Sequence, residues 1–132
     1  MTLAEIRDWL KTFNLADNYY IGRLDNKKER SLGVYDLPSR GAPVMALGGV
    51  SCSSYDVRGV SLLIHWNRNA NETEMAAARV WNALFGAAHV DVPSGSHIHY
   101  VQPLVPKPIS VDTDDNGVYE YVIEFNIYYR RY

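Results

Sequence analysis

The sequence lacks a second cysteine and any long apolar run, and each absence excludes a class of protein. Cys52 is the only cysteine among 132 residues, so the chain cannot form an internal disulfide, which fits a reducing compartment. No stretch approaches the ~20 apolar residues that a membrane-spanning helix needs, so we expect no membrane partner. Glu5, Arg7 and Asp8 interrupt the N-terminal segment, so we expect no signal peptide there.

The sequence also lacks an excess of charge of either sign. Thirteen lysines and arginines stand against 15 aspartates and glutamates, a formal net charge of −2. The chain therefore has no bulk attraction for nucleic acid, and we predict no direct nucleic-acid binding. Hydrophobic residues make up 47% and charged residues 21%, as in an ordinary globular protein. A chain of this length buries roughly two-thirds of its unfolded surface, so we expect residues 1–132 to form a single domain.

The pattern of apolar residues predicts an α+β fold, a mainly antiparallel sheet with two helices packed on one face, because strands follow one another in runs. Thr2 and Glu5 have the spacing of a capping box and predict a helix at the N-terminus. A second helix is expected from residue 72 to residue 85, with Asn71 or Thr73 as its N-cap. Strands are expected at 19–24 and 31–35, and these two would form a hairpin. A further strand is expected at 98–105, where Pro103 favours an edge strand or a bulge. The other expected strands are 55–66, 109–111 and the C-terminal segment.

The C-terminal segment has the clearest strand pattern in the chain. Apolar residues alternate with Glu120, Glu124 and other polar side chains, so one face should be buried and the other should meet water. The chain has ten tyrosines, and tyrosine and arginine are favoured at the centres of protein interfaces. The end of the strand is therefore a candidate assembly interface. The apolar face comprises Tyr119, Tyr121, Ile123, Phe125 and Ile127, and the interface candidates are Tyr128, Tyr129, Arg130, Arg131 and Tyr132.

Residues 36–54 are the irregular part of the chain. They contain prolines and glycines and show weak periodicity, and a loop of this length in a compact domain is usually functional or disordered. Val44, Met45 and Leu47 make simple disorder a poor explanation, because a disordered segment is usually poor in apolar residues. We therefore predict an extended arm that packs on a partner, with these three residues as further interface candidates.

His97 and His99 are the residues that most resemble a metal site. Alternate side chains of a strand point the same way, so both imidazoles could reach one ion, with a third ligand from His65, His89 or Asp91. No Cys-x-x-Cys or His-Glu-x-x-His motif accompanies them. We favour two surface histidines and predict no metal. The alternative, a small metal-binding enzyme domain that uses His97 and His99, stays open.

The remaining motifs give no support for catalysis. Asp112, Asp114 and the residues after them resemble a calcium loop only loosely, because Glu120 falls too early for the twelfth position. Gly48-Gly49 lacks the lysine and the strand–turn–helix context of a phosphate-binding loop. Cys52 lies in no recognised nucleophile motif. We therefore predict no enzyme, no catalytic residue and no cofactor.

Six short motifs follow one another along most of the chain. They are Tyr-Ile-Gly-Arg-Leu at 20–24, Ser-Leu-Gly-Val-Tyr-Asp at 31–36, Ala-Leu-Gly-Gly at 46–49, Ser-Tyr-Asp-Val-Arg-Gly-Val at 54–60, Trp-Asn-Ala-Leu at 81–84 and Asp-Asp-Asn-Gly-Val-Tyr-Glu-Tyr at 114–121. In this order they resemble the minor capsid or tail terminator proteins of long-tailed phages and prophages of Gram-positive bacteria. Each motif is degenerate, so the resemblance depends on their order.

The resemblance implies a structural protein without catalytic activity. Such proteins are similar in fold to the phage lambda tail terminator, and they assemble as a ring, commonly a hexamer, that caps the tail tube and ends its polymerisation. The implied partners are further copies of the chain, the tail tube protein and the head–tail connector protein, with contacts at 23–35 and 36–54. The protein would be made in the cytoplasm of the bacterial host and end in the virion at the head–tail junction. An alternative is another head–tail joining protein, a stopper or an adaptor.

Overall fold

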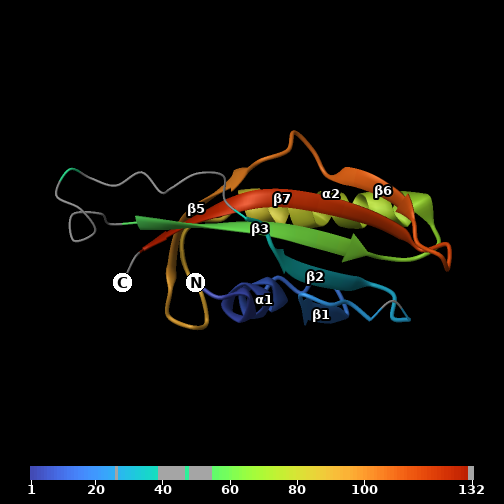
Figure 1. Cartoon of the computed structure of the whole chain (residues 1–132), viewed down its shortest axis with the longest axis horizontal. Helices are drawn as coiled ribbons and strands as arrows, with labels where there is room; N and C mark the ends of the chain where they lie inside the picture. The colour runs from blue at the N-terminus through green and yellow to red at the C-terminus, as the bar shows by residue number, and fades with distance from the viewer. Residues whose placement is uncertain (26, 39–46, 48–54, 131–132) are drawn as a thin grey trace.

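The computed structural model describes residues 1–25, 27–38, 47 and 55–130. In this part of the chain seven strands form one curved sheet in the order β1-β2-β3-β7-β5-β4, and β6 also pairs with β7 (Figure 1). Nearly all neighbouring strands are antiparallel. The elements are α1 (Leu3–Lys11), β1 (Asn18–Ile21), β2 (Ser31–Asp36), β3 (Tyr55–His65), α2 (Ala70–Phe85), β4 (Ala88–Asp91), β5 (His97–Pro103), β6 (Ile109–Thr113) and β7 (Tyr119–Arg130).

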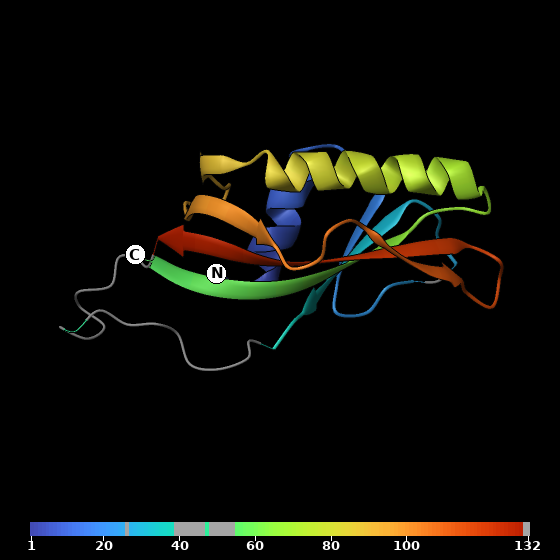
Figure 2. The ribbon, with the colours of Figure 1, turned by 90° about the horizontal axis from the view of Figure 1, so that it is seen from above.

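Both helices cover the same face of the sheet (Figure 2). α1 packs against β1 and β2, whereas α2 packs against β5 and β7. One cluster of buried side chains joins the two helices to the central strands, so the predicted α+β fold with two helices on one face is confirmed. The centre of this core consists of Ile6, Leu10, Val60, Leu62, Ile64, Val80, Leu84, Ile123, Phe125 and Ile127.

The helix ends follow from side chains that satisfy free backbone amides. The hydroxyl of Thr2 accepts a hydrogen bond from the amide of Glu5 at 3.2 Å, as the capping box predicts. The second helix begins two residues earlier than expected, and neither Asn71 nor Thr73 is its N-cap. Asn69 has an extended backbone and accepts from the amide of Glu72 at 3.1 Å, so it holds the N-cap position instead.

The predicted hairpin between the first two strands is wrong, because β1 and β2 run parallel. Asn18 pairs with Ser31 and Ile21 with Val34. After β1 the chain returns to the end of the sheet at which β1 began, so that β2 starts beside the start of β1. On this path Leu24 is buried against Gly33, where an added Cβ would lie 3.2 Å from the Cδ1 of Leu24. The polar segment after Leu24 is therefore part of a return path and not a hairpin tip.

The last third of the sheet contains one strand that the sequence did not reveal. β4 has only four residues, too few to show a period, and it pairs with β5. The pairing of β5 with β7 shifts by one residue between Ile98 and Tyr100, which confirms a bulge, although it lies far from Pro103. β6 confirms that the chain resumes pairing after residue 108.

Candidate assembly surface and histidine cluster

Tyr55, Tyr100 and Tyr128 form a tyrosine cluster on the face of the sheet that points away from the helices. They come from β3, β5 and β7, which are neighbours in the sheet. The rings of Tyr100 and Tyr128 stack with centroids 4.4 Å apart and planes 9° apart, and Tyr55 lies 5.8 Å from Tyr128. The hydroxyl of Tyr128 donates to Oε1 of Gln102 at 3.1 Å. The cluster therefore holds its rings in fixed positions although Tyr100 is 45% exposed.

The environment of Tyr100 disfavours loss of its hydroxyl proton. Partial desolvation raises the pKa of Tyr100 above its ordinary value, and its interactions with Tyr128 and Tyr55 raise it further. The cluster presents aromatic rings whose hydroxyl groups can donate or accept hydrogen bonds. Rigid side chains of this kind lose little conformational entropy when they are buried at an interface.

The strand register accounts for the cluster. Tyr100 stands opposite Tyr128, and Tyr55 lies two residues from Val57, the partner of Tyr128 on β3, so all three side chains share one face of the sheet. Tyr55 and Tyr100 were not among the sequence-predicted interface residues. Only the register of β7 with both of its neighbours brings them to Tyr128, and no local signal in the sequence contains that register.

The predicted C-terminal interface residues do not all share one face. Tyr128 lies in the tyrosine cluster, and Arg130 is exposed at the end of β7. Tyr129 is half-buried and packs against the core, as the alternation of a strand requires. Arg131 and Tyr132 lie outside the described residues. Within this segment, Tyr128 and Arg130 are thus the side chains whose described surroundings leave them open to a partner.

The predicted arm lies mostly outside the described residues, and so do Val44, Met45 and Cys52. Leu47 is described, and its side chain is fully exposed. The start of the arm is fixed to the sheet, because Asp36 forms an ion pair with Arg58 at 2.9 Å. The amide of Leu37 also donates to the carbonyl oxygen of Gly59 at 3.3 Å. The chain therefore leaves β2 in a defined direction.

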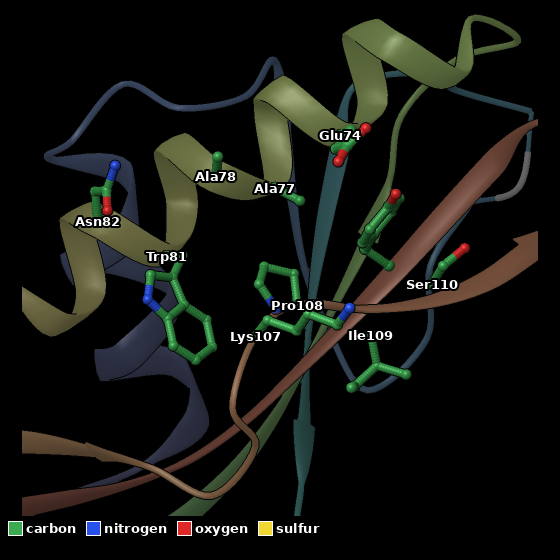
Figure 3. A pocket seen from close by; sticks show the side chains of 10 residues that line it. Glu74, Ala77, Ala78, Trp81, Asn82, Lys107, Pro108, Ile109 and Ser110 are labelled. Carbon is green, nitrogen blue, oxygen red and sulfur yellow. The ribbon is translucent and has the colours of Figure 1, made fainter.

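An apolar groove of about 390 Å³ lies between α2 and the start of β6 (Figure 3). Trp81 on the helix faces Pro108 and Ile109 across the groove (Figure 3). Tyr121 of β7 also lines the groove. Ile109 is 39% exposed, so the groove is open to solvent. No sequence pattern predicted this surface, because the groove depends on how far α2 lies from β6.

His89, His97 and His99 form a histidine cluster on β4 and β5. One ring nitrogen of each lies within 4.8 Å of the other two. The pairing of Ala88 with Tyr100 and of Val90 with Ile98 places His89 opposite His99. The cluster adjoins the tyrosine cluster, because His89 and His99 line one surface pocket with all three tyrosines.

His65 lies apart from the histidine cluster and is completely buried in β3. Its Nδ1 lies 2.9 Å from Oε2 of Glu120 and 3.7 Å from Oδ2 of Asp114. The prediction that Glu120 simply faces water is therefore wrong, because its carboxylate accepts a hydrogen bond from a buried imidazole. Of the three candidates for a third ligand, the structure brings His89 and Asp91 to the histidine pair and excludes His65.

Neither helix in the described residues is long and apolar enough to cross a membrane.

Comparison with known families covers nearly the whole chain. A family model described as bacteriophage tail terminator protein matches residues 3–131, which include every element from α1 to β7. Among curated proteins and solved structures the chain has no significant match. The chain belongs to the bacteriophage tail terminator protein family.

Proposed function

We propose that the protein assembles as a ring, commonly a hexamer in proteins of this kind, on the end of the phage tail tube. There it ends tube polymerisation and presents its other side to the head–tail connector protein. The observation that carries this proposal is the family match over residues 3–131. The protein would be made in the cytoplasm of the bacterial host and would function in the virion at the head–tail junction, without catalysing a reaction.

A ring needs two different patches that meet head to tail. We assign one patch to Tyr128, Arg130, Arg131 and Tyr132 at the end of β7, joined by Tyr55 and Tyr100, and we leave out Tyr129 because it packs against the core. The other is the arm that carries Val44, Met45 and Leu47. Exposed aromatic rings and a fully exposed leucine support this assignment, because isolated proteins gain nothing from leaving such side chains in water.

The proposal is tested by adding the purified protein to polymerising tail tube protein and measuring tube lengths by negative-stain electron microscopy. A terminator should shorten the tubes in proportion to its concentration and leave extra density at one end of each tube. A stopper or an adaptor should bind the connector protein and leave tube length unchanged. Unchanged tubes without terminal density would refute the proposed function.

A variant altered on the proposed ring patch is compared with a matched control altered outside it. Tyr128→Ala should fold and yet lose the effect on tube length, because it removes the ring on which Tyr100 stacks. Glu74→Ala, on the rim of the α2 groove, should retain the effect, since the groove is not part of either proposed patch.

A further inference from the structure

We propose that His89, His97 and His99 bind a divalent transition-metal ion, zinc being the best fit. A terminator that acts by assembly alone does not require this site. The three side chains come from two paired strands, β4 and β5, and each offers one ring nitrogen within 4.8 Å of the other two. In a tetrahedral zinc site, with Zn–N bonds of about 2.0–2.1 Å, neighbouring nitrogens lie about 3.4 Å apart. Each nitrogen therefore has to move by less than about 1 Å.

The carboxylate of Asp91 favours the geometry of such a site. Its Oδ1 lies 2.8 Å from Nδ1 of His97. A carboxylate accepts from N–H, so Nδ1 of His97 carries the proton and Nε2 is left with its lone pair. Metal-ligating histidines commonly have a carboxylate partner of this kind, which fixes the tautomer and the orientation of the ring. Asp91 is thus a positioning residue for His97.

Backbone irregularities bring the other two imidazoles to the same place. His89 has a φ of 52°, a left-handed conformation in the middle of a short strand. His99 lies at the bulge, where β5 has one residue more than the paired segment of β7. Both features are local departures from regular pairing, and both fall on a histidine. The ring centroids lie 5.3 to 6.3 Å apart, which is close enough for the three rings to share one ion.

The donor set selects the kind of ion. Three neutral imidazoles suit zinc, copper, nickel and cobalt, whereas magnesium and calcium prefer oxygen ligands. The side chain of His89 is exposed and those of His97 and His99 are partly buried, so water can take the fourth position of a tetrahedral zinc. A bound ion would fasten the edge strand β4 to β5 next to the tyrosine cluster.

The test uses the full-length protein without a histidine tag and zinc chloride as the probe, so it needs neither tail tubes nor ring formation. Isothermal titration calorimetry should give one zinc per chain. His99→Asn and His89→Asn should each weaken binding by more than about 100-fold, beyond the roughly 10–100-fold that loss of an orienting partner costs. Asp91→Asn should fall within that smaller range. Asparagine tolerates the left-handed backbone of residue 89, so the variant should fold.

Asp112→Asn is the matched control. It removes an exposed carboxylate from another residue with positive φ. Asp112 lies in β6, which pairs with the start of β7, whereas the histidine cluster adjoins Tyr128 near the other end of that strand, so this variant should bind zinc as the unaltered protein does. Saturating zinc should also raise the melting temperature of the unaltered protein and of Asp112→Asn, but not that of His99→Asn. Absence of zinc binding by the unaltered protein would overturn the site, and so would equal affinities for His99→Asn and Asp112→Asn.

Discussion

Replacing Glu120 by alanine should destabilise the fold much more than the same change at Glu124. Both side chains lie on the face of β7 that points away from the helices, and both occur in the same strand. Oε2 of Glu120 lies 2.9 Å from Nδ1 of the fully buried His65. Glu124 has no side-chain hydrogen bond or ion pair within the described part of the chain. The two substitutions therefore compare the same chemical change with and without a buried partner.

The expected loss follows from what the alanine leaves behind. In Glu120→Ala the buried Nδ1–H of His65 would lose its hydrogen bond, and the nearest remaining carboxylate oxygen, Oδ2 of Asp114, lies 3.7 Å away, beyond hydrogen-bond distance. Nε2 of His65 is already buried without a hydrogen-bond partner among the described residues, so the imidazole would lose its strongest contact. An unsatisfied buried group of this kind costs about 1–3 kcal/mol, and about 3–5 kcal/mol if the pair is ionic. Glu124 is partly exposed and lacks such a partner, and substitutions at surface sites of this kind usually change stability by less than about 0.5 kcal/mol.

Urea unfolding followed by tryptophan fluorescence and far-UV circular dichroism measures this difference. With a urea m-value of about 2 kcal/mol/M, a loss of about 2 kcal/mol lowers the midpoint by about 1 M. Glu120→Gln should lose less, because its amide oxygen can still accept from Nδ1–H. Coincident midpoints for Glu120→Ala and Glu124→Ala would refute the inference that the buried pair stabilises the sheet.

Three other predictions concern a close backbone contact, a helix cap and the tyrosine cluster. Gly59→Ala should lower the free energy of unfolding by about 1–3 kcal/mol, because its Cβ would lie 2.5 Å from the carbonyl oxygen of Leu37; an unchanged urea midpoint would contradict this. Asn69→Ala should cost about 1 kcal/mol, whereas Asn71→Ala should cost almost nothing, since only Asn69 caps α2; equal thermal midpoints would contradict it. Tyr128→Ala should reduce the assembly mass seen by native mass spectrometry across a concentration series while the monomer stays folded, and an unchanged mass would exclude the tyrosine cluster from the interface.

The parts of the fold that were predicted correctly depend on one-sided burial. The alternation from Tyr119 to Ile127 reveals the inner face of β7, because a single sheet face is packed against helices and the other is not. The capping box at Thr2 is equally local. A segment as short as β4 shows no such alternation, and its formation depends on pairing with β5, so no pattern in its own four residues could reveal it.

The parts that failed depend on where a segment lies relative to strands distant in the sequence. A polar stretch between two apolar ones predicts a hairpin, yet the path through Leu24 reverses the direction of β2 relative to β1. His65 and Glu120 are 55 residues apart, and only the register of β3 with β7 makes them partners. The same holds for the tyrosine and histidine clusters: the residue types were visible in the sequence, and the register and the bulge that assemble them were not.

The structure also changes how the C-terminal interface should be tested. Deleting residues 128–132 would remove the ladder partners of Val57 and Asp56 in β3, together with the side chain of Tyr129 that packs against the core. Loss of assembly in such a deletion could then follow from loss of folding alone. Tyr128→Ala keeps the ladder and the inward-facing Tyr129, and it removes one exposed ring from the tyrosine cluster. Tyr128 contacts two rings, and each aromatic pair contributes about 0.5–1.5 kcal/mol beyond its buried area. The monomer should therefore lose about 1–3 kcal/mol and still fold, and a loss of self-association by a monomer that urea unfolding shows to be folded would report on the interface itself.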